Sequence, residues 1–290
     1  MAIESMALLM EAGKERDLFD IILESDCRER GATRGDSLSR MSMLYAAMRR
    51  SGEGYDPSLR SGSGMVGGDG ARMRAYAASG KTICGEYIGS VLAQALEMGE
   101  SNACMKCIVA APTAGSCGVL PAVLLPYQVR EQLDDETMVR ALYIAGAVGQ
   151  IIAEKASIAG AAGGCQAEIG TASAMGAAAL CYLAGGDAQA VCHAAAIAIK
   201  SLLGLVCDPI AGLVEVPCVK RNAAGAMIAM SSAEMALAGI RSAVPPDEVI
   251  AAMREVGDKM DVSLRETGIG GIAGTPFGQT IAGKMAGQAL

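Results

Sequence analysis

The pattern of hydrophobic and polar positions predicts helices along most of the chain. Apolar residues recur three and four positions apart over residues 3–30, which is the spacing of one amphipathic helix or a pair of them. A Gly-rich segment near the end, residues 266–284, is expected to be irregular, either frayed or laid across a partner or an active site. An apolar helix should directly follow the segment PTAGSCG, and further helices are expected at 37–50, 71–78, 86–99, 135–154, 168–184, 188–205, 219–240 and 246–262.

The composition favours the same fold class. Hydrophobic residues make up 52% of the chain, yet Trp is absent and there are only two Phe and seven Tyr. A core of Ala, Leu, Ile, Val and Met suits close helix packing, whereas strands draw on β-branched and aromatic residues. We find no internal repeat and no convincing domain break. The sequence therefore predicts an all-α fold in a single large helical domain, residues 1–290, with Gly-rich loops at the functional site.

Charge and hydropathy exclude several classes of protein. The formal net charge is -7 and no basic tract is present, which argues against a nucleic-acid-binding face. Two apolar runs, at 141–164 and 172–207, are interrupted by charged residues and leave no uncharged span of roughly 20 residues. We therefore expect no membrane insertion. The first residues lack a secretory pattern, and ten cysteines without such a signal indicate a reducing, cytoplasmic environment with thiol or metal chemistry.

Two loops are candidates for binding an anion. The small residues of PTAGSCG, at 112–118, precede a helix, and the free N–H groups of a helix N-terminus bind carboxylates or phosphates. An ordinary turn into a buried helix explains the same residues. The Gly/Ser-rich stretch at 51–70 is either a flexible connection or a lid whose backbone N–H groups meet an anion.

Three of the ten cysteines differ from the others in their surroundings. Cys165, Cys207 and Cys218 each lie in a Gly- or Pro-containing loop at a predicted helix end, where a side chain can turn toward a site. Three thiolates held this way would bind three irons of a cubane and leave the fourth open to a non-protein ligand. The spacing alone does not select this site, because the CxxC at 104–107 would suit a redox pair or half a zinc site. Cys117 would suit a nucleophile whose pKa is lowered by a helix N-terminus.

Six segments together carry a resemblance to a known family. They are GMVGGD at 64–69, SGK at 79–81, VAAPTAGSCGVLPAVL at 109–124, GCQAEIGTASAMGAAAL at 164–180, CDPIAGLVEVPCVKRNA at 207–223 and ETGIGGIAGTP at 266–276. With these segments the chain resembles the α chain of the bacterial iron–sulfur-dependent L-serine dehydratases, and only residues 1–60 are weakly covered. The resemblance places the ligands of a [4Fe–4S] cluster on Cys165, Cys207 and Cys218.

The resemblance also implies an activity and a partner. The activity is removal of water from L-serine to give pyruvate and ammonia, with the open iron as a Lewis acid. The expected substrate contacts are Thr113, Gly115, Ser116 and Asn222, although a helix cap and a turn residue explain them equally well. The family has a second, β region with a Ser/His-containing motif that this chain lacks. We therefore expect the chain to be the α half of a two-chain enzyme and part of an oligomer.

The general base and two alternative functions are left open. The partner could supply the base. On this chain the possible bases are Lys81, Lys106 and Lys200, of which we select Lys81. The single histidine, His193, sits in a predicted helix and is expected to be a satisfied core or interface residue. A related cluster-dependent L-cysteine desulfidase would use the same site. A non-catalytic zinc- or thiol-binding helical scaffold would instead use the CxxC at 104–107.

Overall fold

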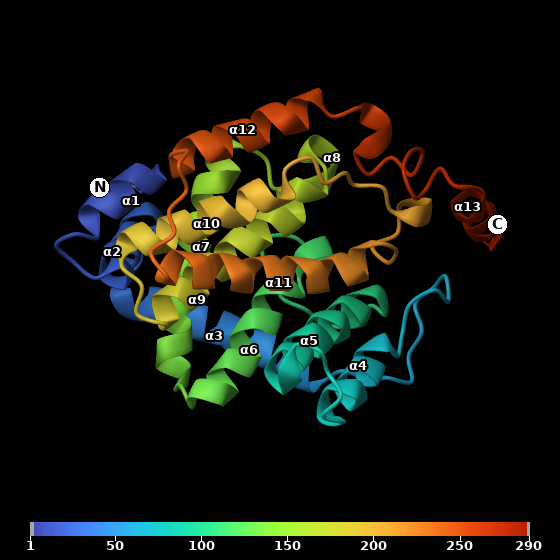
Figure 1. The fold of residues 1–290 in the computed structure, drawn as a ribbon, viewed down its shortest axis with the longest axis horizontal. Coiled ribbons are helices and arrows are strands. Elements are labelled where there is room, and N and C mark those ends of the chain that lie inside the picture. Colours follow the sequence, from blue (N-terminus) through green and yellow to red (C-terminus); the bar gives the residue numbers. More distant parts are fainter. Residues whose placement is uncertain (1–2, 289–290) are drawn as a thin grey trace.

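A computed structural model describes residues 3–288, and this part of the chain is a bundle of helices (Figure 1). No strand occurs within residues 3–288, where an isolated bridge joins Cys207 and Arg265. The prediction of an all-α fold is therefore confirmed, whereas the assignment of residues 1–290 to a single domain stays a prediction. The α-helices are α1 (Met6–Ala12), α2 (Leu18–Arg30), α3 (Arg34–Glu53), α4 (Asp69–Ala78), α5 (Gly85–Ala103), α6 (Val119–Glu131), α7 (Asp135–Lys155), α8 (Gly160–Gly163), α9 (Thr171–Leu183), α10 (Ala188–Leu202), α11 (Cys218–Leu237), α12 (Pro246–Lys259) and α13 (Pro276–Gln288). The shorter turns are η1 (Ala114–Ser116), η2 (Gln166–Gly170), η3 (Ile210–Gly212) and η4 (Val262–Leu264), of which η2 is π-helical.

Side-chain caps set helix ends that the hydrophobic pattern alone misplaces. Thr33 and Asp36 form a capping box, in which each side chain accepts a backbone N–H of the other residue. Helix α3 therefore begins at Arg34, before the predicted start at residue 37, and it runs on to Glu53, beyond the predicted end at residue 50. Of the two alternatives predicted for residues 3–30, one helix or a pair, the structure shows the pair, α1 and α2.

The core is centred on α9, whose residues are buried from Thr171 to Cys181. Helices α7, α10 and α11 all pack on it. Small residues allow this close packing: a Cβ added at Gly176 would lie 3.2 Å from Val123 Cγ2 and 3.3 Å from Ala229 Cβ. This arrangement explains why the chain needs so few aromatic residues, because close contact of Ala- and Gly-rich faces fills the interior without large side chains.

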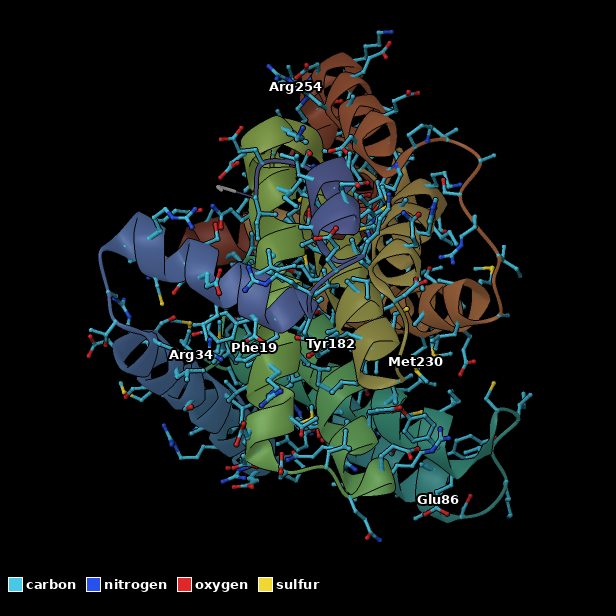
Figure 2. All side chains as sticks on the ribbon, turned by 90° about the vertical axis from the view of Figure 1, so that its left-hand side faces the viewer. Phe19, Arg34, Glu86, Tyr182, Met230 and Arg254 are labelled. Atoms are coloured by element: carbon cyan, nitrogen blue, oxygen red, sulfur yellow. The ribbon has the colours of Figure 1, made fainter. Side chains whose placement is uncertain are left out.

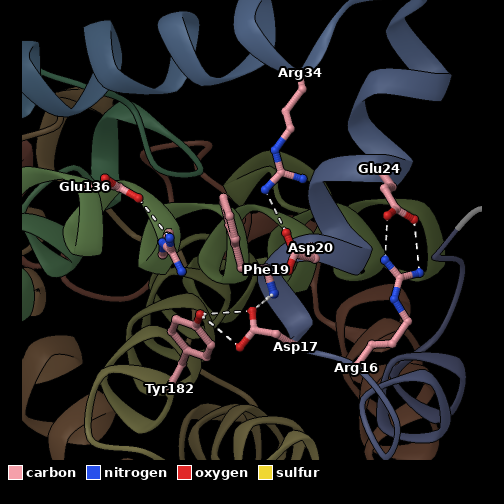
Figure 3. A network of polar contacts seen from close by, with 9 residues as sticks. Arg16, Asp17, Phe19, Asp20, Glu24, Arg34, Glu136 and Tyr182 are labelled. Carbon is pink, nitrogen blue, oxygen red and sulfur yellow. Dashed lines mark hydrogen bonds and ion pairs between the residues drawn. The ribbon is translucent and has the colours of Figure 1, made fainter.

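One aromatic residue of the N-terminal helices, Phe19, contacts the core within charged surroundings. The Phe19 ring meets Tyr143 edge-on, with 5.5 Å between the ring centroids. The guanidinium groups of Arg34 and Arg140 lie 5.6 and 4.9 Å from the Phe19 centroid (Figure 3). Each arginine also pairs with a carboxylate at the surface. Phe19 therefore fixes α2 against α7 on the side of the molecule that faces the viewer in Figure 2.

The segment near the end of the chain differs from its prediction. Residues 266–275 are irregular, as expected, and lie beside the segment that contains Cys207. Residues 276–288 form helix α13, so the predicted irregular structure is wrong there. Helix α13 lies at the edge of the molecule (Figure 1) and packs on η3. None of the helices described here is both long enough and apolar enough to cross a membrane.

Candidate active site

Three segments that are distant in sequence bring the selected cysteines together. Cys165 directly precedes η2, Cys207 lies in the extended segment after α10, and Cys218 is the first residue of α11. All three are buried. The Cys207 thiol donates a hydrogen bond to the Cys165 sulfur, and the charge on Cys165 acts directly on Cys218. The structure therefore places the three predicted metal ligands in one group, which we call the cysteine group.

The sulfur atoms of the cysteine group differ in their tendency to ionise. The hydrogen bond from Cys207, together with the nearby Arg221 guanidinium, lowers the pKa of Cys165. The same hydrogen bond and burial raise the pKa of Cys207. Burial raises the pKa of Cys218 to about 12. Cys165 is thus the thiol of the group that loses its proton most readily, and all three thiols must be deprotonated to become metal ligands.

Arg221 supplies the positive charge beside the cysteine group. It projects from α11, where one guanidinium nitrogen donates to the Val206 carbonyl at 2.8 Å. A second nitrogen lies 2.8 Å from Asp208 Oδ1. This pair is buried, so neither charge is left without a partner in a region of low polarity. Arg221 therefore links the start of α11 to the segment that carries Cys207.

The Gly-rich segment after α12 holds Cys207 through its backbone. The Cys207 N–H donates to the Leu264 carbonyl at 2.8 Å, and the Glu266 N–H donates to the Cys207 carbonyl at 2.6 Å. The neighbouring Asp208 accepts the Ile272 N–H at 2.8 Å through Oδ2. Of the two predictions for this segment, the structure favours the second, because residues 266–272 lie against the segment that carries Cys207.

Glu168 is a buried carboxyl group at the site that sequence analysis missed. Its Oε1 accepts the Thr113 hydroxyl at 2.7 Å, and its Oε2 lies 3.9 Å from the Cys207 sulfur, as a second possible acceptor for that thiol besides Cys165. Burial raises its pKa. Two glycines leave room for it, because a Cβ at Gly115 or Gly160 would lie 3.1 or 2.8 Å from its carboxylate oxygens. The available signal was an acidic residue three positions after Cys165 in an otherwise apolar segment.

The PTAGSCG segment forms turn η1 beside Glu168. Thr113 and Ser116 bond to each other through their hydroxyl groups at 3.1 Å, and Thr113 continues to Glu168. Gly115 and Ser116 are buried. The structure therefore brings Thr113, Gly115 and Ser116 to the cysteine group, and their contact with a substrate stays a prediction.

Asn222 joins this turn to α11. Its amide nitrogen donates to the carbonyls of Gly115 and Cys218 at 2.8 and 3.0 Å, and its Oδ1 accepts the Gly118 N–H at 2.8 Å. Both amide hydrogens are thus occupied by the backbone. Asn222 lies at the site, as predicted. Its hydrogen bonds hold turn η1 against Cys218.

Glu215 ties the Gly/Ser-rich loop to the segment between Cys207 and Cys218. Its Oε2 accepts hydrogen bonds from the hydroxyl groups of Ser61, at 2.6 Å, and Ser63. Further along the loop, the N–H groups of Asp69 and Gly70 donate to the Glu100 carboxylate. The anion bound by the backbone N–H groups at the end of GMVGGD is therefore the carboxylate of Glu100, a residue of this chain.

Other candidates from the sequence lie outside the cysteine group. Lys81 is exposed in the turn between α4 and α5, and no hydrogen bond or ion pair within residues 3–288 joins it to the group. Cys117 is buried and its pKa is raised to about 12, so the lowered pKa expected for it is wrong. His193 accepts the Ser242 N–H through Nδ1 at 3.1 Å, which confirms a satisfied histidine.

The described residues hold no group of three or more His, Cys, Asp or Glu side chains spaced for a single metal ion. A cubane differs from such an ion because its thiolate ligands bind separate irons. The geometry thus defines an all-helical protein with a buried group of three cysteines, flanked by a carboxyl and a guanidinium.

Comparison with known proteins gives the family. The chain belongs to the serine dehydratase alpha chain family, whose model matches residues 13–273. It is 47% identical to the probable L-serine dehydratase, alpha chain, of Bacillus subtilis, over 97% of this chain and 95% of that protein. It is 44% identical to the L-serine dehydratase, alpha chain, of Peptoniphilus asaccharolyticus, over 91% of each. The match to the L-serine dehydratase TdcG of Escherichia coli is 45% identical and spans 62% of this chain but 40% of that protein.

Proposed function

We propose that this chain is the α half of a two-chain L-serine dehydratase and that Cys165, Cys207 and Cys218 hold its [4Fe–4S] cluster. The observation that carries the proposal is the gathering of three buried thiols in a chain of this family. They come from three separate segments and share one carboxyl and one guanidinium neighbour. L-serine enters the proposal through the printed names of the relatives.

The donor set fits such a cluster. Thiolates are the usual protein ligands of iron–sulfur clusters, and three of them leave one iron for another ligand. The apolar side chains of Val119, Ile169 and Ala172 pack with Cys165 and Cys207, which keeps the sulfur atoms away from bulk water. When bound, the open iron supplies a Lewis acid that stabilises the charge developing on the leaving hydroxyl oxygen of L-serine.

The side chains around the group supply the other requirements of an elimination. Turn η1 offers the hydroxyl group of Thr113 and the start of α6 for orienting a carboxylate. Glu168 can accept a proton at Oε2, and its raised pKa makes it a stronger base than an exposed carboxylate. The base is therefore assigned to Glu168 in place of Lys81.

The coverage of the relatives supports a partner chain. The chain spans 95% and 91% of two relatives that are named alpha chains. The region of TdcG that matches this chain covers 40% of that protein, whose name carries no chain designation. We infer that a second polypeptide, the β chain, supplies the part of the enzyme that TdcG carries on the same chain, and that the two assemble as an oligomer.

The test is an anaerobic assay. The chain is reconstituted with iron and sulfide, and pyruvate is measured from L-serine with and without the β chain. We expect a stable cluster and pyruvate only when both chains are present. A stable cluster without pyruvate in either case would contradict L-serine as the substrate, and L-cysteine would then be tried. Failure to form any cluster would contradict the cofactor and favour the scaffold function.

A further inference from the structure

Exposed apolar side chains gather on the C-terminal arm, by which we mean residues 262–288. Val262, Ile269 and Phe277 are 68%, 65% and 63% exposed, and Ile272 is also exposed. A second group, Leu237, Ile240 and Val244, lies around the end of α11 and is less exposed, and Met43 and Leu44 are neighbours on α3. The arm holds the more exposed of the two groups and adjoins the candidate active site, and an exposed apolar group of this kind suits a surface that another protein covers.

Helix α13, the last element of the arm, has little packing of its own. It stands at the edge of the molecule in Figure 1 and packs on η3. Phe277, Ile281 and Met285 are spaced four residues apart and therefore share one face of the helix. The only charged residue on α13 is Lys284. A helix of this length is marginal in water unless its apolar face is packed. Ile281 and Met285 are partly covered, whereas Phe277 is exposed and open to a partner.

The arm is continuous with the candidate active site. Its residues Leu264 and Glu266 exchange backbone hydrogen bonds with Cys207, and its Ile272 N–H is accepted by Asp208. Helix α13 packs on η3, which lies between Cys207 and Cys218. A protein bound to the arm would therefore rest against the segment that carries two of the three cysteines.

We propose that the C-terminal arm is the docking surface for the β chain, with the Phe277 face of α13 at its centre. This inference rests on the proposed two-chain function. The β chain is favoured over a second copy of this chain because it must complete a site that the arm itself adjoins. In TdcG the region that this chain does not match belongs to the same polypeptide, so the region must have a place beside the helical part.

The test compares two variants of the reconstituted chain. Phe277→Asp puts a charge on the proposed surface, and Met43→Asp on α3 is the matched control, because Met43 is 65% exposed on a helix outside the arm. Affinity for the β chain is measured by titration, together with iron content, thermal midpoint and sedimentation of the chain alone. We expect Phe277→Asp to weaken β-chain binding about tenfold or more, as for an interface hot spot. Iron content and thermal midpoint should stay unchanged, and Met43→Asp should bind normally.

Three results would overturn the inference, and they differ from failure of the proposed function. Normal β-chain binding by Phe277→Asp would show that the surface lies elsewhere. Loss of self-association with unchanged β-chain binding would assign the arm to a second copy of this chain. Equal loss of affinity in both variants would show a non-specific effect of added charge. If the unmodified chain forms pyruvate without a β chain and binds none, the two-chain function itself fails.

Discussion

At the scale of single residues, surroundings decide which cysteines are available for chemistry. Cys117 and Cys181 are buried among apolar groups, and burial raises the pKa of each to about 12. Cys165 is equally buried, but the Cys207 thiol and Arg221 lower its pKa. The sequence context of Cys165, Cys207 and Cys218 predicted side chains that turn toward one place, and the structure brings the three together, because loops at helix ends can aim side chains inward. Sequence context failed for Cys117 because the pKa of a thiol depends on tertiary burial, which a local motif does not reveal.

These pKa shifts predict a pattern of alkylation. With the unmodified chain at pH 8, anaerobic iodoacetamide should label the exposed Cys84 and Cys107 and spare Cys117 and Cys181. The reason is that only the thiolate reacts, and a group with a pKa near 12 remains protonated at pH 8. Peptide mass spectrometry after timed labelling measures the result. Labelling of Cys117 at the rate of Cys84 would contradict the burial described here.

Glu168 carries a prediction about catalysis. Glu168→Gln keeps an acceptor for the Thr113 hydroxyl but removes the proton-accepting carboxylate, so kcat for L-serine should fall about 100-fold or more. KM and iron content should change little, because the substitution leaves the thiols in place. Glu86→Gln, at an exposed position on α5, is the control. An unchanged kcat in the Glu168 variant would move the base to the partner chain.

At the scale of elements, regular segments follow the hydrophobic pattern, and irregular ones depend on contacts. Most helices lie where apolar periodicity predicts them, because each buries one face in a shared core. Three features escaped prediction. The start of helix α3 is set by its capping box, and the π-helical turn η2 lies where Cys165 and Glu168 meet the site. Helix α13 contains glycines and lies at the edge of the molecule.

The close contact between the arm and Asp208 predicts the effect of a single methyl group. Gly271 has a φ of 59°, and a Cβ there would overlap the Asp208 carboxylate that accepts the Ile272 N–H. Gly271→Ala should therefore lower the free energy of unfolding by more than the roughly 1–2 kcal/mol that positive φ costs a non-glycine residue. Gly239→Ala is the matched control, because Gly239 also has positive φ but nothing within 4 Å of an added Cβ.

Denaturant unfolding measures both variants, and hydrogen exchange at Ile272 reports whether the arm has loosened. Equal losses of stability in the two variants would contradict the close contact at Asp208. A larger loss in Gly271→Ala, with faster exchange at Ile272, would show that the arm is held on the active site through this contact.

At the scale of the whole molecule, the helical frame brings the residues of the candidate site together, and the proposal places a partner on one side of it. The family and the all-α class could be predicted from sequence, because the motifs are specific and the composition suits helices. The meeting of Glu168, Arg221 and Asp208 with the cysteines could not, because it depends on how η2, the segment after α10 and α11 pack. In Figure 1 the arm and the loop after α10 lie on the same side of the molecule.

The measurement that tests the central claim most directly is the iron and sulfide content of cysteine variants purified without oxygen. The chain should contain iron and inorganic sulfide in equal amounts, and Cys207→Ser should lose both, together with pyruvate formation, because two thiolates hold a cubane poorly. Cys104→Ser and Cys107→Ser, the matched controls, should retain all three. Iron retained in Cys207→Ser, or lost in either control, would contradict the assignment of the cluster to Cys165, Cys207 and Cys218.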